Sequence, residues 1–226
     1  MTIISPSGGL VYHWRARKFK HLWEPFKQEL SQLLCQKKNR PAHLKILGAS
    51  GGYCLPGTFL NQFEKIEAVD PDLTAPFAFF MNHPEVKVRW QVKRLQFEES
   101  RPLDAPIELL LYANLLGQIP LHDRRGPIIL QRFKSELEGS LSQNPMISFH
   151  DLYSSTLPFP KSLLGRHPGP LAPKDLISYF DRDGGRREIT DHLTWNLFEN
   201  GPRHFLQWQI TPEQYHLIEY VERPEN

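Results

Sequence analysis

A glycine-rich turn followed by an acidic residue is the pattern in this sequence that most directly suggests chemistry. The turn is Gly48-Ala49-Ser50-Gly51-Gly52, and Asp70 comes 18 residues after its last glycine (70 − 52 = 18). Glycines let the backbone approach a ligand where a Cβ atom would clash or force an unsuitable backbone. A carboxylate at this distance is well placed to accept hydrogen bonds from ribose hydroxyls. The pattern therefore predicts a nucleoside site.

The glycine spacing argues against a dinucleotide site. The fingerprint G-x-G-x-x-G, started at Gly48, needs glycines where the chain has Ser50 and Tyr53, and the variant with glycines three apart fails at Cys54. No tyrosine is followed four residues later by a lysine, so the catalytic pair of short-chain reductases is missing, and so is the lysine of a Walker loop. A nicotinamide-dependent oxidoreductase therefore stays as a second alternative only.

The spacing G-x-G-x-G fits better, because Gly48 and Gly52 match its outer positions and Ser50 stands in the middle. With this turn the chain resembles class I S-adenosylmethionine-dependent methyltransferases, over roughly residues 44–222. The similar segments are Leu47–Tyr53 (first motif), Val69–Asp72 (acidic end of the second strand), Ile107–Asn114 with Leu115-Leu116-Gly117 (fourth strand), Ile147–Asp151 (fifth strand) and the C-terminal strands.

The resemblance implies S-adenosylmethionine as the cofactor and assigns residues to it. It places Asp70, with Pro71 beside it, at the ribose hydroxyls, and Val92 and Lys93 near the adenine. It places the methionine moiety against Gly48, Ala49, Ser50, Gly51 and Gly52. Two departures, Ile46 where the family usually has an acid and Ser50 for the middle glycine, favour the first alternative. That alternative is a non-catalytic relative that binds S-adenosylmethionine, its product or another nucleoside.

Methyl transfer from a sulfonium is an in-line displacement that depends mainly on alignment. A base helps when the nucleophile carries a proton, and the candidates are Tyr112, His150, Asp151 and His192. We expect Asn114, at the end of the fourth strand, to position the acceptor and His150, at the end of the fifth, to accept its proton. No metal site is predicted, because neither H-E-x-x-H nor a paired His/Cys spacing occurs.

The elements that must position these residues alternate between strand and helix. Apolar runs predict strands over 44–47, 66–69, 86–90, 107–112 and 146–149, helices over 58–63, 73–82 and 128–138, and antiparallel strands toward the C-terminus. This alternation is typical of a doubly wound α/β sheet. With the resemblance, the predicted fold is a mainly parallel, seven-stranded Rossmann-like sheet with an antiparallel C-terminal hairpin.

Two further segments frame that sheet. Residues 1–43 are predicted to form an N-terminal helical cap, in which one helix begins at Pro25 because proline suits the first helical position. Residues 44–226 are predicted to form the methyltransferase-like domain, and its proline-rich segment 154–173 is interpreted as a long loop or lid that closes over the cofactor.

Composition limits the class of protein. The chain has 226 residues with 27 basic and 25 acidic side chains, a balance that gives no argument for nucleic acid, although the run Arg15, Arg17, Lys18, Lys20 keeps such a partner open. Two cysteines exclude a disulfide framework, and neither a signal peptide nor an apolar stretch of about 20 residues is visible. We therefore expect a cytoplasmic protein with no membrane partner. The methyl acceptor, small or macromolecular, and the oligomeric state are not predicted.

Overall fold

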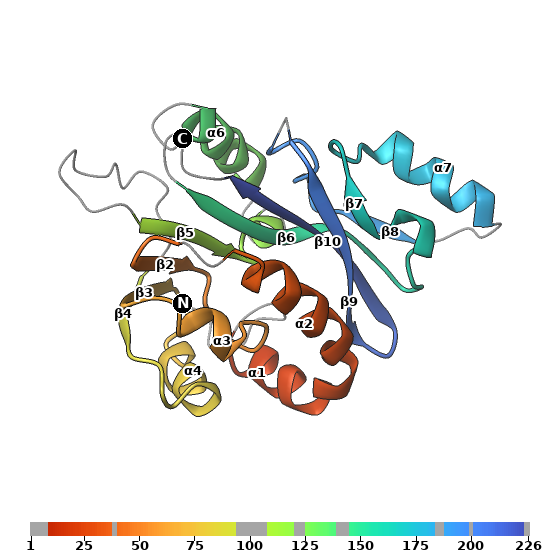
Figure 1. The fold of residues 1–226 in the computed structure, drawn as a ribbon. Helices are drawn as coiled ribbons and strands as arrows, with labels where there is room; N and C mark the ends of the chain where they lie inside the picture. Colours follow the sequence, from red (N-terminus) through yellow and green to blue (C-terminus); the bar gives the residue numbers. More distant parts are fainter. Residues whose placement is uncertain are drawn as a thin grey trace. The chain divides into compact units, whose positions relative to one another are not determined.

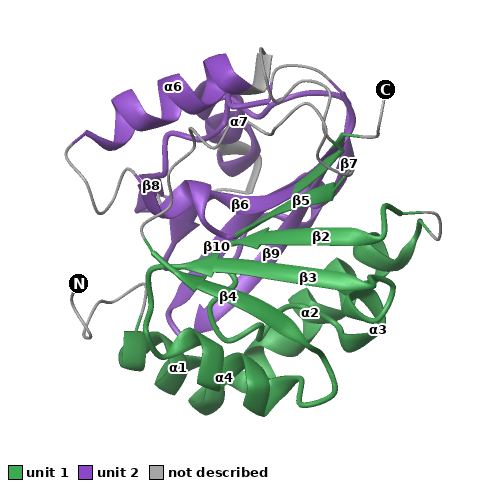
Figure 2. Ribbon diagram, turned by 90° about the vertical axis from the view of Figure 1, so that its left-hand side faces the viewer, with its two compact units in different colours: residues 1–113, 143–147, 223–226 green, residues 114–142, 148–222 purple. Residues whose placement is uncertain are grey.

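The computed structural model describes residues 9–37, 40–93, 108–119, 125–138, 145–183, 188–198 and 201–223. The chain divides into two compact units (Figure 2). Unit 1 contains residues 1–113, 143–147 and 223–226, and unit 2 contains residues 114–142 and 148–222.

Unit 1 is built on parallel strands. Their order is β4-β3-β2-β5, and all three pairings are parallel. The strands are β2 (His43–Leu47), β3 (Lys65–Asp70), β4 (Val88–Val92) and β5 (Glu108–Ala113). Apolar side chains on both faces of β5 are buried, as a central parallel strand requires. These strands confirm the four predicted from the apolar runs, with shifts of one or two residues at their ends.

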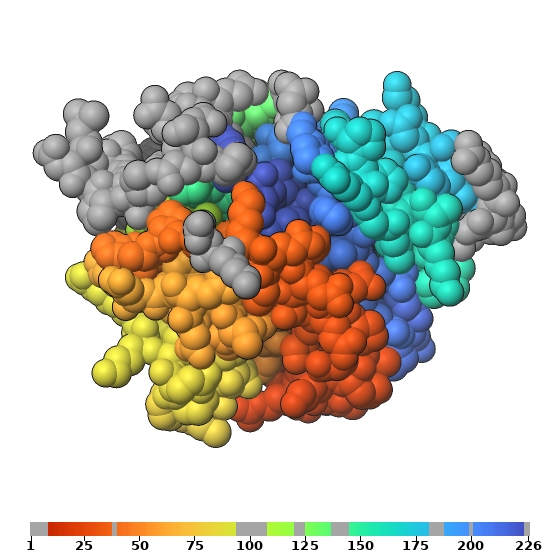
Figure 3. Space-filling view, in the orientation of Figure 1, coloured from red at the N-terminus to blue at the C-terminus, as the bar shows by residue number. Residues whose placement is uncertain are grey.

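The helices of unit 1 are α1 (Gly9–Lys18), α2 (Lys20–Cys35), α3 (Gly57–Leu60) and α4 (Ala75–Asn82) (Figure 1). In the space-filling view, α1 and α2 in red lie next to the orange α3 and the yellow α4 on one face of the unit (Figure 3). Helices α1 and α2, from the segment predicted as an N-terminal cap, belong to the same compact unit as the parallel strands.

The predicted helix start at Pro25 is wrong, because Pro25 lies inside α2. A proline inside a helix removes one backbone hydrogen bond and costs about 3 kcal/mol. Five apolar side chains of α2 are buried on one face: Trp23, Phe26, Leu30, Leu33 and Leu34. Burying each of them contributes roughly 1.5–3 kcal/mol, so tertiary packing offsets the local penalty and the helix continues through the proline.

Unit 2 carries the antiparallel strands. Its strands follow the order β6-β10-β9-β7, and β8 pairs with β6 outside this series. Strands β9 and β10 form the predicted antiparallel hairpin. The strands are β6 (Met146–Ser155, whose first two residues belong to unit 1), β7 (Gly165–His167), β8 (Ile189–Asp191), β9 (Arg203–Thr211) and β10 (Gln214–Arg223, whose last residue belongs to unit 1). The helical elements are η1 (Leu116–Gln118), α6 (Gly126–Glu138), η2 (Lys161–Leu163) and α7 (Pro173–Asp183).

Two predicted features of unit 2 need correction. The fifth strand does not end at Phe149, since β6 continues to Ser155 and is buried along nearly its whole length. The proline-rich segment 154–173 is not a continuous loop, because it contains the end of β6, η2 and β7. Its residues Phe159, Leu163 and Leu171 pack into the core cluster of the unit. Its predicted closure over a cofactor stays a prediction.

The predicted fold class is confirmed: a mixed α/β protein with mostly parallel strands and antiparallel C-terminal strands. The short strands β7 and β8 are additions to the seven predicted strands. Among the described residues, no helix combines the length and the apolar character that crossing a membrane requires.

Candidate functional site

The glycine-rich turn of unit 1 leaves β2 in a conformation that needs its glycines. Gly48 and Gly52 have positive φ angles of 79° and 65°, and Ser50 also lies in the left-handed region at 45°. The Gly48 N–H donates to the Val69 carbonyl at 2.9 Å. This bond ties the start of the turn to β3, so the turn follows β2 and Asp70 is the last residue of the neighbouring strand β3.

Asp70 organises this turn directly. Its Oδ2 accepts the Ser50 N–H at 2.7 Å, and its Oδ1 accepts the Asp72 N–H at 2.8 Å. The residue is 5% exposed. Each carboxylate oxygen can accept a second hydrogen bond, so Asp70 can hold the turn and still accept from ligand hydroxyls.

The pKa values of Asp70 and Asp72, two carboxyl groups two residues apart, are shifted in opposite directions. Burial raises the pKa of Asp70 to about 6, against the lowering effect of its two backbone hydrogen bonds. Burial also favours the neutral form of Asp72, but hydrogen bonds from His13 and Thr74 outweigh it and hold the pKa of Asp72 well below its usual range.

The N-terminal helix is attached at Asp72. The Gly9 N–H donates to Asp72 Oδ2 at 2.9 Å, and His13 Nε2 lies 3.0 Å from the same oxygen. The Tyr53 hydroxyl lies 3.0 Å from His13 Nδ1. Helix α1 is thereby fixed within hydrogen-bond distance of the residues that follow Asp70. The sequence carries no local signal for this contact, because its partners lie on distant segments.

The predicted adenine neighbours lie next to Asp70. Val92 is the partner of Asp70 in the β3–β4 register, and the Lys93 N–H donates to the Asp70 carbonyl at 3.2 Å. Pro71 is exposed. Within unit 1, the structure therefore brings the turn, Asp70 and the end of β4 together at the carboxyl ends of three parallel strands, where open α/β sheets bind ligands.

Helix α4 supports the turn from behind. The Asn82 side chain donates to the Gly51 carbonyl at 2.6 Å, and His83 Nε2 donates to the Gly52 carbonyl at 3.0 Å. A Cβ atom on Gly52 would lie 2.7 Å from the Phe79 ring. Glycine is thus required here by backbone conformation and by packing against α4.

A cavity of about 830 Å³ adjoins the end of the turn. Gly52 and Tyr53 form part of its wall, and α1, α2 and the end of α4 supply most of the rest, including the cations Arg17, Lys20 and Lys27. Asp70 does not line this cavity, which is therefore a feature distinct from the carboxyl-end site.

Asn114 is the first residue of unit 2, after β5. It has a positive φ of 52°, which asparagine tolerates better than most residues, and its N–H donates to the Phe149 carbonyl at 2.8 Å. Its side-chain Oδ1 is buried and accepts no hydrogen bond from the described residues. This oxygen can therefore accept a hydrogen bond from a bound molecule.

His150 lies inside β6 rather than at a strand end, and it is fully buried. Its Nδ1 lies 3.0 Å from Ser148 Oγ, and its Nε2 lies 3.3 Å from Glu219 Oε2. Glu219 in turn accepts a 2.7 Å charge-assisted hydrogen bond from Arg203 Nη1, and both of these side chains are fully buried. The histidine is therefore part of a buried polar network within unit 2.

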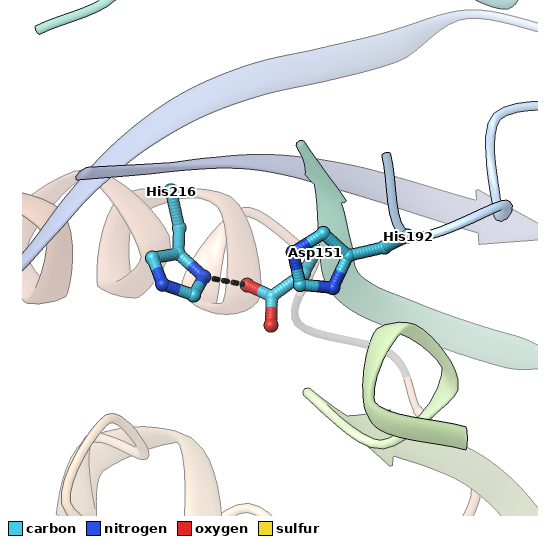
Figure 4. Close-up of side chains that lie close together, drawn as sticks. All are labelled: Asp151, His192 and His216. Atoms are coloured by element: carbon cyan, nitrogen blue, oxygen red, sulfur yellow. Dashed lines mark hydrogen bonds and ion pairs between the residues drawn. The ribbon is translucent and has the colours of Figure 1, made fainter. Parts of the chain in front are cut away.

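A second cluster follows directly along β6. Asp151 Oδ1 accepts from His216 Nδ1 at 2.8 Å, and His192 lies beside the pair (Figure 4). Burial favours the neutral form of Asp151, but His216, His192 and His150 outweigh it and hold the pKa of Asp151 below its usual range. Burial lowers the pKa of His192. The sequence pattern marked Asp151 and His192 as candidate bases but not His216, because no motif in β10 distinguishes this histidine from its neighbours.

Comparisons with known proteins find only distant structural similarity. No family model matches the chain, and no curated protein matches it. Similar solved structures include the N-methyltransferase NodS from Bradyrhizobium japonicum WM9 in complex with S-adenosyl-L-homocysteine, at 10% identity and a TM-score of 0.48, covering 90% of this chain and 88% of that one.

Two further structures cover most of both chains. Magnesium protoporphyrin IX methyltransferase (ChlM) from Synechocystis PCC 6803 with bound SAM has 10% identity and a TM-score of 0.45, over 96% of this chain and 86% of that one. A TehB-like SAM-dependent methyltransferase from Corynebacterium glutamicum has 12% identity and a TM-score of 0.41, over 94% and 98%.

Proposed function

We propose that this chain is a methyltransferase that uses S-adenosylmethionine and acts on an acceptor still to be identified. The observation that carries the proposal is the pairing of the glycine turn with Asp70, whose carboxylate accepts the Ser50 N–H at 2.7 Å. This pairing places a carboxylate beside a stretch of backbone that a ligand can approach closely, at the carboxyl ends of β2 and β3. A nucleoside with a charged tail needs that combination.

Different residues of unit 1 bind different parts of the cofactor. Asp70 accepts hydrogen bonds from the ribose hydroxyls with the lone pairs that Ser50 and Asp72 leave available. Val92, its register partner, lies against the adenine, with Lys93 next to it. The backbone of residues 48–52 lies along the methionine moiety, and Pro71 shapes the turn after the acid. Helix α1, fixed at Asp72, excludes water from this side of the site.

The residues of unit 2 act on the acceptor. Bound S-adenosylmethionine supplies an electrophilic methyl group on a sulfonium, so the acceptor atom gains a methyl and loses a proton to a base or to water. Asn114 positions the acceptor through its buried Oδ1, which accepts no hydrogen bond from the described residues. His150 stays the predicted proton acceptor, although both its ring nitrogens already face polar partners in the buried network.

Asp70→Ala is expected to weaken binding of S-adenosylhomocysteine at least tenfold, because each hydrogen bond to a carboxylate is worth roughly 1.5–3 kcal/mol. Isothermal titration calorimetry with the purified chain measures this directly. Glu67→Ala is the matched control, since Glu67 lies on the same strand but forms ion pairs with Lys65 and Arg89 instead of contacting the turn. Equal affinities in wild type and Asp70→Ala would contradict the placement of the ribose hydroxyls at Asp70.

The same titration separates the alternatives. A wild-type chain that binds neither S-adenosylmethionine nor its product overturns the proposal, and tighter binding of a nicotinamide dinucleotide would favour an oxidoreductase. A chain that binds the cofactor but transfers no methyl group in a screen of cell extract would be a non-catalytic relative.

Cofactor affinity is expected to rise with pH through about 6 and to level off above it. Ribose hydroxyls donate to the ionised carboxylate, so protonation of Asp70 opposes binding, and the affinity falls by up to about tenfold for each pH unit below the pKa. Calorimetric titrations at several pH values across this range test the dependence. Asp70→Asn should bind weakly with no step near pH 6, and a wild-type profile that is flat or falls with pH would contradict the role of Asp70.

The proposal includes a cytoplasmic location. Cys35 and Cys54 are both thiols in the structure, which suits a reducing compartment.

A further inference from the structure

Three buried side chains that commonly bind metals meet in unit 2, apart from the residues assigned to methyl transfer. Asp151 comes from β6, His192 follows β8 and His216 comes from β10, and one ligand atom of each lies within 4.8 Å of the others. Figure 4 shows the three side chains converging from these segments. All three residues are buried, at 0%, 1% and 7% exposure.

The surrounding hydrogen bonds orient two of these side chains. His192 Nδ1 lies 2.7 Å from the Gly117 carbonyl, which can only accept, so Nδ1 carries the proton and the lone pair of Nε2 accepts from the Ser154 hydroxyl at 3.2 Å. Metal-binding histidines usually donate their other ring N–H in this way. Asp151 is held by Gln118, which donates to its Oδ2, and by Thr194, which donates to its backbone carbonyl at 2.6 Å.

Glycine at position 117 allows this arrangement. A Cβ atom there would lie 2.6 Å from the Cβ and the backbone oxygen of Asp151. The backbone carbonyl that fixes His192 therefore sits directly against the carboxylate-bearing residue.

The orientation of His216 determines which of its ring nitrogens can bind an ion. Its Nδ1 is hydrogen-bonded to Asp151, and its Nε2, which is buried and has no hydrogen-bond partner among the described residues, points away from Asp151 and His192 (Figure 4). An ion in the cluster would therefore bind His216 through Nδ1, and Nε2 would take up the proton that Nδ1 gives up.

We propose that Asp151, His192 and His216 bind one divalent transition-metal ion of the Zn²⁺ class. Two imidazoles and one carboxylate suit Zn²⁺, Co²⁺ or Fe²⁺, whereas Mg²⁺ and Ca²⁺ prefer oxygen ligands. Three protein ligands leave a fourth coordination position for water or a ligand group. The site lies within unit 2 and does not depend on methyl transfer.

Binding requires a small contraction of the cluster. Metal–ligand bonds of about 2.0–2.1 Å place tetrahedral ligand atoms roughly 3.4 Å apart, so the side chains must move closer together. The Asp151–His216 and Ser154–His192 hydrogen bonds give way to bonds to the ion, and the His216 proton moves from Nδ1 to the buried Nε2.

Metal titration of the tag-free full chain, first treated with a chelator, tests this site. Calorimetry with Zn²⁺ should show one ion per chain, and Co²⁺ should give the visible absorption of a bound, low-symmetry ion. His192→Asn and His216→Asn should each weaken Zn²⁺ binding at least about 100-fold, since loss of a direct ligand costs more than loss of a supporting residue. His204→Asn is the matched control, because His204 lies on β9, in the same hairpin as His216 but outside the cluster.

Folding of each variant is checked by thermal unfolding without metal. Saturating Zn²⁺ should raise the Tm of wild type and His204→Asn but not that of His192→Asn. A wild-type chain that binds no stoichiometric ion overturns the proposal, and so does a folded His192→Asn variant with wild-type affinity. If His216→Asn does not fold, His192→Asn alone decides the outcome.

Discussion

Arg203→Met is expected to lower the free energy of unfolding by about 3–5 kcal/mol. The guanidinium is fully buried, donates to Glu219 Oε1 at 2.7 Å and to the Phe198 carbonyl at 2.8 Å, and its loss leaves a buried carboxylate without its cation. Urea unfolding followed by circular dichroism measures the change. Arg166→Met, at an exposed position on the neighbouring strand β7, should cost little.

A double variant distinguishes the contribution of the Arg203–Glu219 ion pair from that of the contacts around it. Arg203→Met combined with Glu219→Leu should be more stable than Arg203→Met alone, because replacing a buried ion pair by apolar side chains is often close to neutral. A double variant less stable than the single one would mean that the Phe198 and His150 contacts, rather than the charge pair, dominate the network. A single variant with wild-type stability would contradict the buried network altogether.

Gly52→Val is expected to destabilise the chain by about 2–4 kcal/mol and to abolish cofactor binding with it. The positive φ of 65° disfavours a β-branched residue, and the new Cβ atom would lie 2.7 Å from the Phe79 ring. The loss therefore comes from the turn and from its packing on α4, in addition to any contact with a ligand. Thermal unfolding and calorimetry on the same preparation measure both effects.

Gly57→Val is the matched control for that substitution. Gly57 begins α3, and the nearest atom to its added Cβ is Glu85 Oε1 at 3.3 Å, the end of a flexible side chain. We expect a much smaller change in Tm for this variant. If Gly52→Val and Gly57→Val lose the same stability, packing against Phe79 does not govern the turn.

Local patterns in the sequence were enough to predict the parallel strands and the cofactor turn. The runs 44–47, 66–69 and 107–112 are short, apolar and bounded by turn residues, and such runs are typical of strands in a parallel sheet. Glycine at 48 and 52 reports a backbone conformation that few other residues adopt, so the turn is visible before any contact is known. Asp70 directly follows the predicted run 66–69, which places it at the carboxyl end of that strand.

Other features depend on contacts between distant segments. Local propensity starts a helix at Pro25, but the buried face of α2 extends it back to Lys20, because apolar burial outweighs one lost hydrogen bond. The strand end predicted at Phe149 is replaced by a strand that continues to Ser155, since pairing with β8 satisfies the backbone of its last residues.

The buried polar side-chain clusters depend most clearly on contacts between distant segments. Asp72 meets Gly9 and His13, and Asp151 meets His216, only after the chain has folded. The sequence by itself determined which strands form and where the cofactor turn lies, because both follow from short-range periodicity and backbone conformation. Tertiary structure alone decided which polar side chains became buried partners, because a buried polar group is stable only beside a group that satisfies it, and that group can come from any part of the chain.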